Sequence, residues 1–142
     1  MSREISLEVA ESMLQAAKRK AAEMKIVEDI AVVDAIGHLK AFVRMDGAWL
    51  GSIDIAIRKA RTARLFDMET SEIGKMSQPG DPIYGVELSN GGLISFGGGI
   101  PLKNSDGTAI GAIGVSGSNV DNDVKVAEAA VEAFCDLEPT SE

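Results

Sequence analysis

Three side chains with different chemistry follow one another closely at Arg44, Asp46 and Trp49. They place a cation, a carboxylate and a large flat aromatic ring around a glycine-containing loop, a mixture of groups that small-molecule pockets present. Each also has a plainer interpretation, with Arg44 as an exposed strand residue, Asp46 as a turn residue and Trp49 as an apolar lid. Taken together, the three side chains predict a ligand-binding pocket at this loop.

The chain contains one histidine, His38, and one cysteine, Cys135. Zinc sites built from several histidines are therefore excluded, and no Cys/His set has the spacing of metal ligands. His38 is the one imidazole available for acid–base chemistry or for axial ligation of a haem iron. Because it falls in a predicted hairpin turn, the alternative is an exposed turn residue with no ligand.

A run of three glycines, Gly97 to Gly99, could let backbone amides approach an anion closely. The run does not open a helix, and the Lys-Ser/Thr pair of a phosphate-binding loop does not follow it. Gly98 and Gly99 are therefore either the floor of a ligand site or a bend in a strand.

A second glycine-containing segment, residues 114–119, runs from a predicted strand to a predicted helix N-terminus, where free amides favour anions. Ser116 or Ser118 could hold a single carboxylate there, such as a tetrapyrrole propionate. Asp121 and Asp123 follow in the first turn and would repel a phosphate. Helix capping is the alternative role for this segment.

A predicted strand–turn–strand–loop–helix unit over residues 30–65 positions the first group of candidates. The β-branched run 30–33 ends in an Asp-x-x-Gly turn, and residues 39–45 alternate as a half-buried strand does. Ser52 is the expected cap of the following helix. Small alanines form the inward side of this helix, so we expect its basic residues to face solvent, a partner subunit or a ligand. These basic residues are Arg58, Lys59, Arg61 and Arg64.

The other predicted elements complete an α+β fold. They are helices at 7–24, 70–76 and 120–134 and strands at 93–96, 100–102 and 109–115. Ser6 is the expected cap of the first of these helices. Tight turns between neighbouring strands require antiparallel pairing, so helices flank a five-stranded antiparallel sheet. One domain is expected over residues 1–136, with 137–142 as a frayed tail.

Composition and charge exclude several functional classes. The 142 residues suit one domain, and 14 basic against 22 acidic groups give a net charge of −8. Such a charge repels polyanions, so we expect no nucleic-acid or anionic-membrane partner. No apolar run is long enough to span a bilayer, and the N-terminus carries acids where a signal peptide is basic and then apolar. We therefore expect a cytoplasmic protein.

Several segments, taken in order, carry a family resemblance. They are Val32-Val33-Asp34, Gly37-His38, Arg44 to Ala48 (RMDGA), Lys59-Ala60, Gly97 to Pro101 (GGGIP) and Ile110 to Gly117 (IGAIGVSG). The sequence resembles the GlcG/HbpS family of haem-binding proteins from about Ile5 to Phe134. Within that family it is most similar to the PduO C-terminal-like members, which are associated with diol and glycolate metabolism.

The resemblance implies a profilin-like, three-layer α/β/α fold with a five-stranded antiparallel sheet. It implies haem as the cofactor, with a corrinoid as the alternative. It also implies a homo-oligomer, which is an octamer in secreted relatives. His38, on a family-like Gly-His turn, would be the metal ligand.

Residues and resemblance together predict a tetrapyrrole-binding protein accessory to diol- or glycolate-type metabolism. The candidate ligand contacts are Arg44, Asp46, Trp49, Gly98, Gly99, Ser116 and His38. One alternative is an enzyme acting on a small hydroxy or oxo acid, in which Arg44 holds the carboxylate and His38 or Asp46 moves a proton. Another is a non-catalytic structural subunit of a metabolic complex.

The candidates do not all fit one site within a single chain. His38 and the loop that carries Trp49 lie at opposite ends of one predicted strand, roughly 20 Å apart at about 3.3 Å per residue. Either one end is structural, or a neighbouring subunit completes the site. We place the pocket at the loop end.

Overall fold

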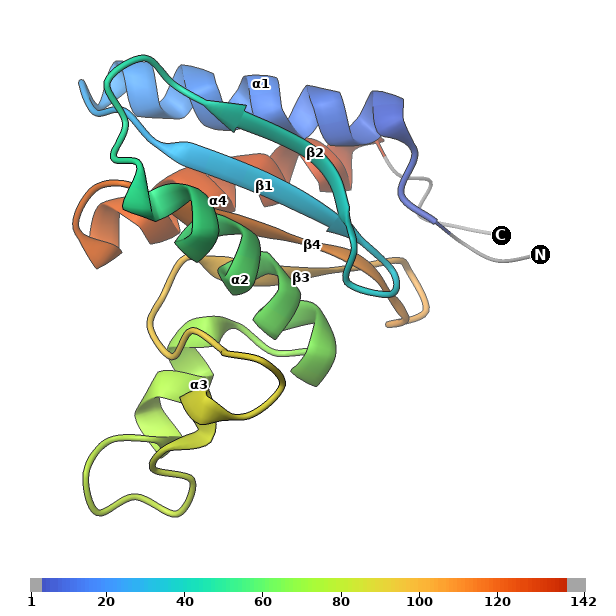
Figure 1. The fold of residues 1–142 in the computed structure, drawn as a ribbon. Helices are drawn as coiled ribbons and strands as arrows, with labels where there is room; N and C mark the ends of the chain where they lie inside the picture. The colour runs from blue at the N-terminus through green and yellow to red at the C-terminus, as the bar shows by residue number, and fades with distance from the viewer. Residues whose placement is uncertain (1–3, 138–142) are drawn as a thin grey trace.

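The computed structural model describes residues 4–137, whose elements are labelled in Figure 1. The helices are α1 (Leu7–Glu23), α2 (Gly51–Phe66), α3 (Thr70–Met76) and α4 (Val120–Leu137), with a 3₁₀ turn, η1, at Val86–Leu88. The strands are β1 (Asp29–Asp34), β2 (Leu39–Arg44), β3 (Gly99–Lys103) and β4 (Ala109–Ser116). Leu137, the first residue of the predicted tail, ends α4, and the rest of that tail lies outside the described residues.

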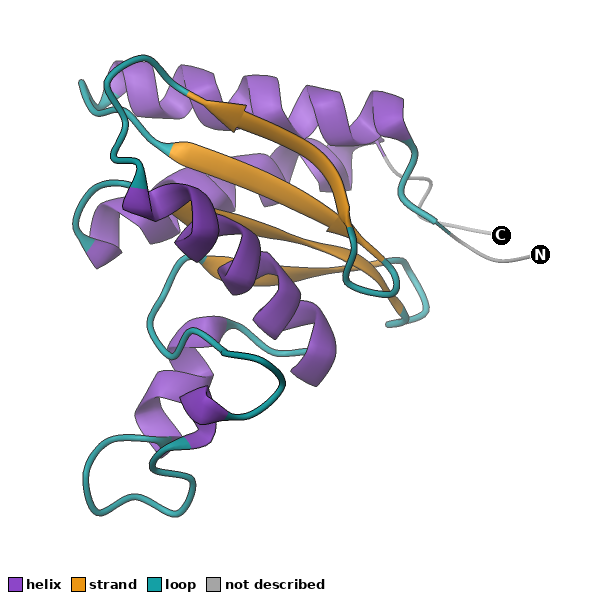
Figure 2. Ribbon diagram, viewed as in Figure 1, coloured by secondary structure: helices purple, strands orange, loops and turns teal. Residues whose placement is uncertain are grey.

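The strands form one antiparallel sheet in the order β2-β1-β4-β3. α1 and α4 pack against each other on one face, and α2 crosses the other face, so the sheet is the middle of three layers (Figure 2). This arrangement confirms the predicted α+β architecture with helices on both faces. None of the helices described is both long enough and apolar enough to cross a membrane.

The two faces of the sheet are packed differently. Towards α1 and α4, residues such as Ile30 and Val32 belong to a large aliphatic core. Towards α2, the helix presents small residues to the sheet and can therefore lie close to it. Ala60 of α2, for example, belongs to the same buried cluster as Val33 of β1. A Cβ atom on Gly114 would lie 2.6 Å from the backbone nitrogen of Ala60. Because both faces are covered, β4 is buried along its whole length.

Local signals in the sequence account for several element boundaries. The Oγ atom of Ser6 accepts a hydrogen bond from the amide of Val9 at 3.1 Å, which confirms Ser6 as the cap of α1. The amide of Gly37 donates to the carbonyl oxygen of Asp34 at 3.0 Å and closes the predicted turn between β1 and β2. These local hydrogen bonds fix where α1 begins and how β2 returns.

The predicted strand at residues 93–96 is wrong, and the described sheet has four strands rather than five. The backbone of this segment finds its partners elsewhere. The amide of Leu93 donates to the carbonyl oxygen of Glu87 at 2.9 Å, and the amide of Ile94 donates to Thr62 Oγ1 at 3.1 Å. The backbone of this segment is therefore tied to η1 and to α2 instead of extending the sheet.

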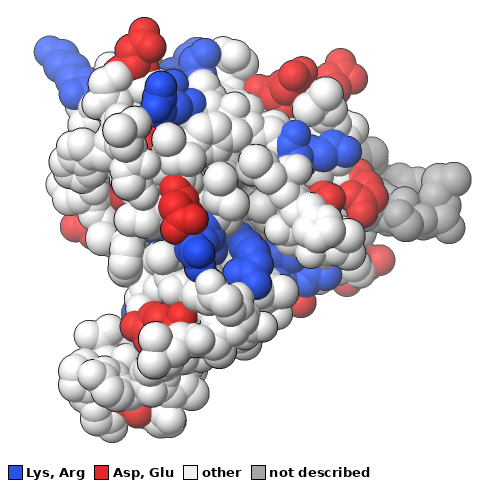
Figure 3. Space-filling model, in the orientation of Figure 1, with Lys and Arg blue, Asp and Glu red and all other residues white. Residues whose placement is uncertain are grey.

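Residues 67–98 form a projecting segment that contains α3 and η1 and extends away from the sheet (Figure 1). Arg58 and Arg61 of α2 hold its returning loop, because their guanidinium groups donate to the carbonyl oxygens of residues 90–92. Figure 3 shows Lys and Arg atoms gathered where the body meets this segment. The basic face of α2 is thus partly occupied by the protein's own backbone.

Candidate functional site

Two hollows flank residues 45–50, the loop between β2 and α2. The tryptophan hollow has a volume of about 420 Å³ and the arginine hollow one of about 390 Å³. The tryptophan hollow is lined by Ile26, Val27, Gly47, Trp49, Gly117, Ser118 and Asn119. The arginine hollow is lined by Lys18, Val27, Val43, Arg44, Met45 and Asp46. Val27 lines both, so the two hollows adjoin each other.

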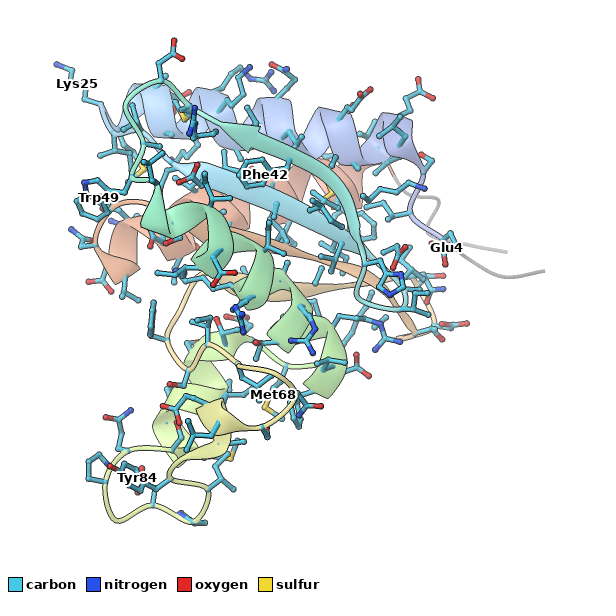
Figure 4. The ribbon with its side chains drawn as sticks, in the orientation of Figure 1. Glu4, Lys25, Phe42, Trp49, Met68 and Tyr84 are labelled. Carbon is cyan, nitrogen blue, oxygen red and sulfur yellow. The ribbon has the colours of Figure 1, made fainter. Side chains whose placement is uncertain are left out.

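Backbone hydrogen bonds shape the loop between them. The amide of Met45 donates to the carbonyl oxygen of Glu28 at 3.1 Å, and the amide of Ala48 donates to the carbonyl oxygen of Met45 at 3.0 Å. Gly47 has a φ of +87°, a left-handed conformation that glycine adopts without a steric penalty. The turn leaves Trp49 63% exposed, and Figure 4 shows it at the same end of the molecule as Lys25.

Three predicted site residues therefore meet at one end of the sheet. Arg44 and Asp46 line the arginine hollow, and Trp49 lines the tryptophan hollow beside it. The adjoining hollows offer an exposed aromatic ring together with two cations, Arg44 and Lys18. These groups suit a flat apolar ligand that carries carboxylates.

Gly98 and Gly99 lie away from both hollows. A Cβ atom on Gly98 would lie 2.6 Å from Lys59 Nζ, and the amide of Gly99 donates to Thr70 Oγ1 at 2.9 Å. Gly98 also has a φ of +128°. These contacts agree with the alternative interpretation of the run, a bend that brings the start of β3 close to α2.

Ser116 is buried, and its Oγ atom lies 3.0 Å from Ser52 Oγ. The hydroxyl thus joins β4 to α2 rather than facing a hollow. The predicted capping role of Ser52 is wrong, because α2 begins at Gly51 and has no side-chain cap. Ser52 is the second residue of the helix, two positions after the cap residue Leu50, and its hydroxyl is directed to the sheet.

His38 is exposed at the turn between β1 and β2, at the far end of β2 from Arg44. Its backbone amide donates to Asp34 Oδ1 at 2.9 Å. Within residues 4–137, no group of three or more His, Cys, Asp and Glu side chains is placed to hold a metal ion. A role for His38 as the single protein ligand of a haem iron therefore stays a prediction.

The sequence interpretation missed a buried charge cluster next to the tryptophan hollow. Lys59 is among the residues expected to face solvent, a partner subunit or a ligand, yet it is fully buried within the chain. Its Nζ atom donates to Asp123 Oδ2 at 3.1 Å and to the carbonyl oxygen of Val115 at 2.8 Å. It also lies 5.0 Å from the centre of the Phe96 ring, a cation–π distance. Lys59 thus extends from the α2 layer to a helix of the opposite layer.

The helical spacing of α2 contained the signal for this burial. Lys59 lies three residues after Ala56 and four before Ala63, both of which are buried, so it falls within the apolar stripe. Its charge led to the opposite expectation. A lysine within an alanine stripe predicts a buried partner of opposite charge.

Glu28 belongs to the same cluster and lies beneath Gly117. It is fully buried, and neither of its carboxyl oxygens has a hydrogen-bond partner of standard geometry among the described residues. Burial, followed by the hydrogen-bonding and repulsive effects of Asp123, raises the pKa of Glu28 to about 9. Burial of Lys59 itself lowers its pKa, and the carboxylate of Asp123 opposes that shift.

Asp29, the first residue of β1, adds a third buried carboxyl. Its oxygens also lack hydrogen-bond partners within the described residues. Burial raises the pKa of Asp29, and the charge of Arg44, which lies opposite Asp29 on β2, lowers it. Arg44 therefore contributes its charge both to the arginine hollow and to a buried acid.

With this geometry in place, comparison with known proteins is decisive for the family. A family model described as haem degrading protein HbpS-like matches residues 5–132. The chain belongs to the HbpS-like family. A 15.0 kDa protein from the dhaT–dhaS intergenic region of Citrobacter freundii is 40% identical to this HbpS-like chain over 134 residues, which are 94% of each protein. The resemblance predicted from sequence motifs is thereby confirmed.

Other relatives carry more specific descriptions. GlcG of Escherichia coli is 36% identical over 79% of this chain and 81% of its own length. The corrinoid adenosyltransferase PduO of Citrobacter freundii is 35% identical over 131 residues. Those residues are 92% of this HbpS-like chain but only 39% of PduO.

Solved structures share the fold over nearly the whole chain. Protein ORFY of Klebsiella pneumoniae superposes with a TM-score of 0.93 at 37% identity, covering 97% of this chain and 96% of that one. A complex of PduOC with haem superposes with a TM-score of 0.89 at 32% identity, covering 99% of this chain and 100% of that one. HbpS itself gives a TM-score of 0.84 at 30% identity, covering 93% of this chain and 91% of HbpS.

Proposed function

We propose that this HbpS-like protein binds a tetrapyrrole, with haem as the ligand. The observation that carries the proposal is the likeness to PduOC in complex with haem, which extends over 99% of this chain at 32% identity. A corrinoid is the alternative ligand, supported by the likeness to the corrinoid adenosyltransferase PduO. The accessory role in diol- or glycolate-type metabolism and the cytoplasmic location remain part of this proposal.

The loop end of the sheet has groups that suit a haem. The exposed ring of Trp49 and the side chain of Val27 supply an apolar surface against which the flat macrocycle can pack. Arg44 and Lys18 in the adjoining hollow can pair with propionates. When bound, haem supplies redox-active iron, and the residues of this chain supply the apolar contact, the charge pairing and an axial ligand.

Two side chains are candidates for that axial ligand. Met45 lines the arginine hollow, and its sulfur lies 3.4 Å from the amide nitrogen of Glu28, from which it accepts a hydrogen bond. His38 lies at the other end of β2 and reaches the same haem only from a neighbouring subunit. We infer that the protein is a homo-oligomer, an octamer by resemblance, in which this second arrangement is available.

Titration with haemin tests the proposal, with saturable Soret absorbance as the expected result. Arg44→Met should weaken binding by about three- to tenfold, because it removes one partly exposed charge pair. Lys40→Met is the matched control, since Lys40 is an exposed cation of the same strand that lines neither hollow. Absence of saturable binding contradicts the proposal, and equal effects of the two variants contradict the assigned site.

The family description favours a second activity, the degradation of haem. Loss of the Soret band after a reductant and oxygen are added to the complex would show turnover. His38→Ala and Met45→Leu then separate the two axial ligands, because only loss of the true ligand shifts the Soret maximum. A Soret band that stays stable under these conditions would show that the protein binds haem without degrading it.

A further inference from the structure

The charge cluster next to the tryptophan hollow holds more acids than its buried cation can balance. Glu28, Asp29 and Asp123 are each no more than 2% exposed, and Lys59 is the buried ammonium among them. If every group were ionised, Lys59 would balance one of the three acids and Arg44, which acts on Asp29, would balance a second, so one negative charge would remain uncompensated. Buried charge without a partner is strongly disfavoured, so a buried acid of this kind keeps a proton.

Geometry assigns that proton to Glu28. Asp123 accepts hydrogen bonds from Lys59 Nζ at 3.1 Å and from the amide of Ser118 at 3.0 Å, which stabilises its ionised form. Glu28 accepts no such bond within the described residues. A proton on Glu28 gives it a donor, and the acceptor is Asp123, which acts on Glu28 both by hydrogen bonding and by repulsion. Burial and the effect of Asp123 raise the pKa of Glu28 to about 9.

We propose that Glu28 and Asp123 share one proton, and that this proton holds residues 117–119 closed as a wall of the tryptophan hollow. The charged groups that act on Glu28 come from three elements: Asp123 of α4, Lys59 of α2 and Asp29 of β1. When the proton leaves, two carboxylates face each other with one ammonium between them. The repulsion then acts on the segment that Asp123 holds through Ser118. Haem is not required for this behaviour.

Residues 117–119 are the side of the cluster that can move. Gly117 has no side chain, and a Cβ atom there would lie 2.9 Å from Glu28 Oε1, so the segment rests directly on the carboxyl group. Asn119 is exposed and Ser118 is half-buried, whereas β1 and Lys59 belong to the buried interior. Movement of this segment changes the tryptophan hollow, which residues 117–119 and Trp49 line together.

Trp49 is the only tryptophan in the chain, so its emission reports on this hollow. In the ligand-free wild type, we expect the emission maximum to shift with a midpoint near pH 9. Glu28→Gln keeps the shape and cannot ionise, so its emission should stay constant across that range. Glu23→Gln, an exposed control at the end of α1, should titrate like the wild type. The same titration in Glu28→Gln as in the wild type would overturn the proposal.

Two further measurements keep the test decisive if Glu28→Gln folds poorly. Infrared spectroscopy of the wild type at pH 7 should show the carbonyl stretch of a buried protonated carboxylic acid, and it should disappear above pH 9. Asp123→Asn keeps a hydrogen-bond acceptor but removes one of the two carboxylates, so Glu28 can ionise beside Lys59 without repulsion and the Trp49 emission should no longer shift near pH 9. Absence of the carboxylic acid band, or a wild-type emission curve for Asp123→Asn, would contradict the shared proton.

Discussion

Lys59 joins two layers of the molecule through one side chain, because its ammonium group leaves α2 and pairs with Asp123 of α4. Lys59→Met would remove the cation and leave Asp123 buried without its partner. We expect a loss of about 3–5 kcal/mol in the free energy of unfolding, measured by urea denaturation. Lys75→Met is the control, since the exposed pair of Lys75 and Glu72 contributes at most about 1 kcal/mol. Equal losses in both variants would show that Lys59 is not paired as described.

Glu28 gives the stability of the protein a specific pH dependence. Its pKa rises from the ordinary value of 4.5 to about 9 on folding, so the folded state binds more protons than the unfolded state between these values. Its contribution is therefore complete below about pH 4.5 and is lost as the pH rises through about 9. Relative to Glu28→Gln, the folded-to-unfolded ratio of the wild type should fall about tenfold per pH unit in this range. Parallel urea midpoints for the two proteins from pH 5 to 9 would contradict the assignment.

At the scale of elements, the close approach of α2 to the sheet depends on glycine. A side chain at Gly114 would meet the backbone of Ala56 and Ala60. Gly114→Ala should therefore destabilise the protein by about 1–3 kcal/mol or more, because neither backbone can move away without loss of packing. Gly51→Ala, at the start of the same helix, has open space around its Cβ position and should change stability by less than about 1 kcal/mol. Thermal unfolding of both variants checks the difference, and similar melting temperatures would contradict it.

Elements with local signals could be predicted from the sequence, while those that depend on distant partners could not. Ser6 and the Asp34–Gly37 turn carry their hydrogen-bond partners within four residues, and both predictions hold. The segment 93–96 has the composition of a strand, but its amides pair with Glu87 and Thr62, which no local pattern reveals. Tertiary contacts therefore overrode its β propensity.

The candidate site likewise has one part that could be predicted from the sequence and another part that could not. Arg44, Asp46 and Trp49 follow one another in the chain, so their common position at the loop could be predicted from spacing alone. Residues 117–119 complete the tryptophan hollow from 68 or more positions away, and Glu28 lies beneath them. These contributions depend on the pairing of β1 with β4, which brings Asp29 opposite Ser116.

At the scale of the whole molecule, large apolar side chains are exposed on the projecting segment. Leu88 is 90% exposed and Tyr84 is 66% exposed, and Figure 4 shows Tyr84 at its far end. Exposed apolar groups of this size are typical of protein–protein contacts. We expect light scattering to give a mass several times the 14.9 kDa of one chain, and Leu88→Lys to lower it. A monomer would leave His38 out of reach of the loop site.

The site of haem binding is tested most directly by hydrogen–deuterium exchange with and without haemin. The proposal predicts slower exchange at residues 45–49 and 117–119, which line the two hollows, and a smaller effect in Arg44→Met than in Lys40→Met. Unchanged exchange in both segments, with protection confined to other parts of the chain, would contradict the loop site.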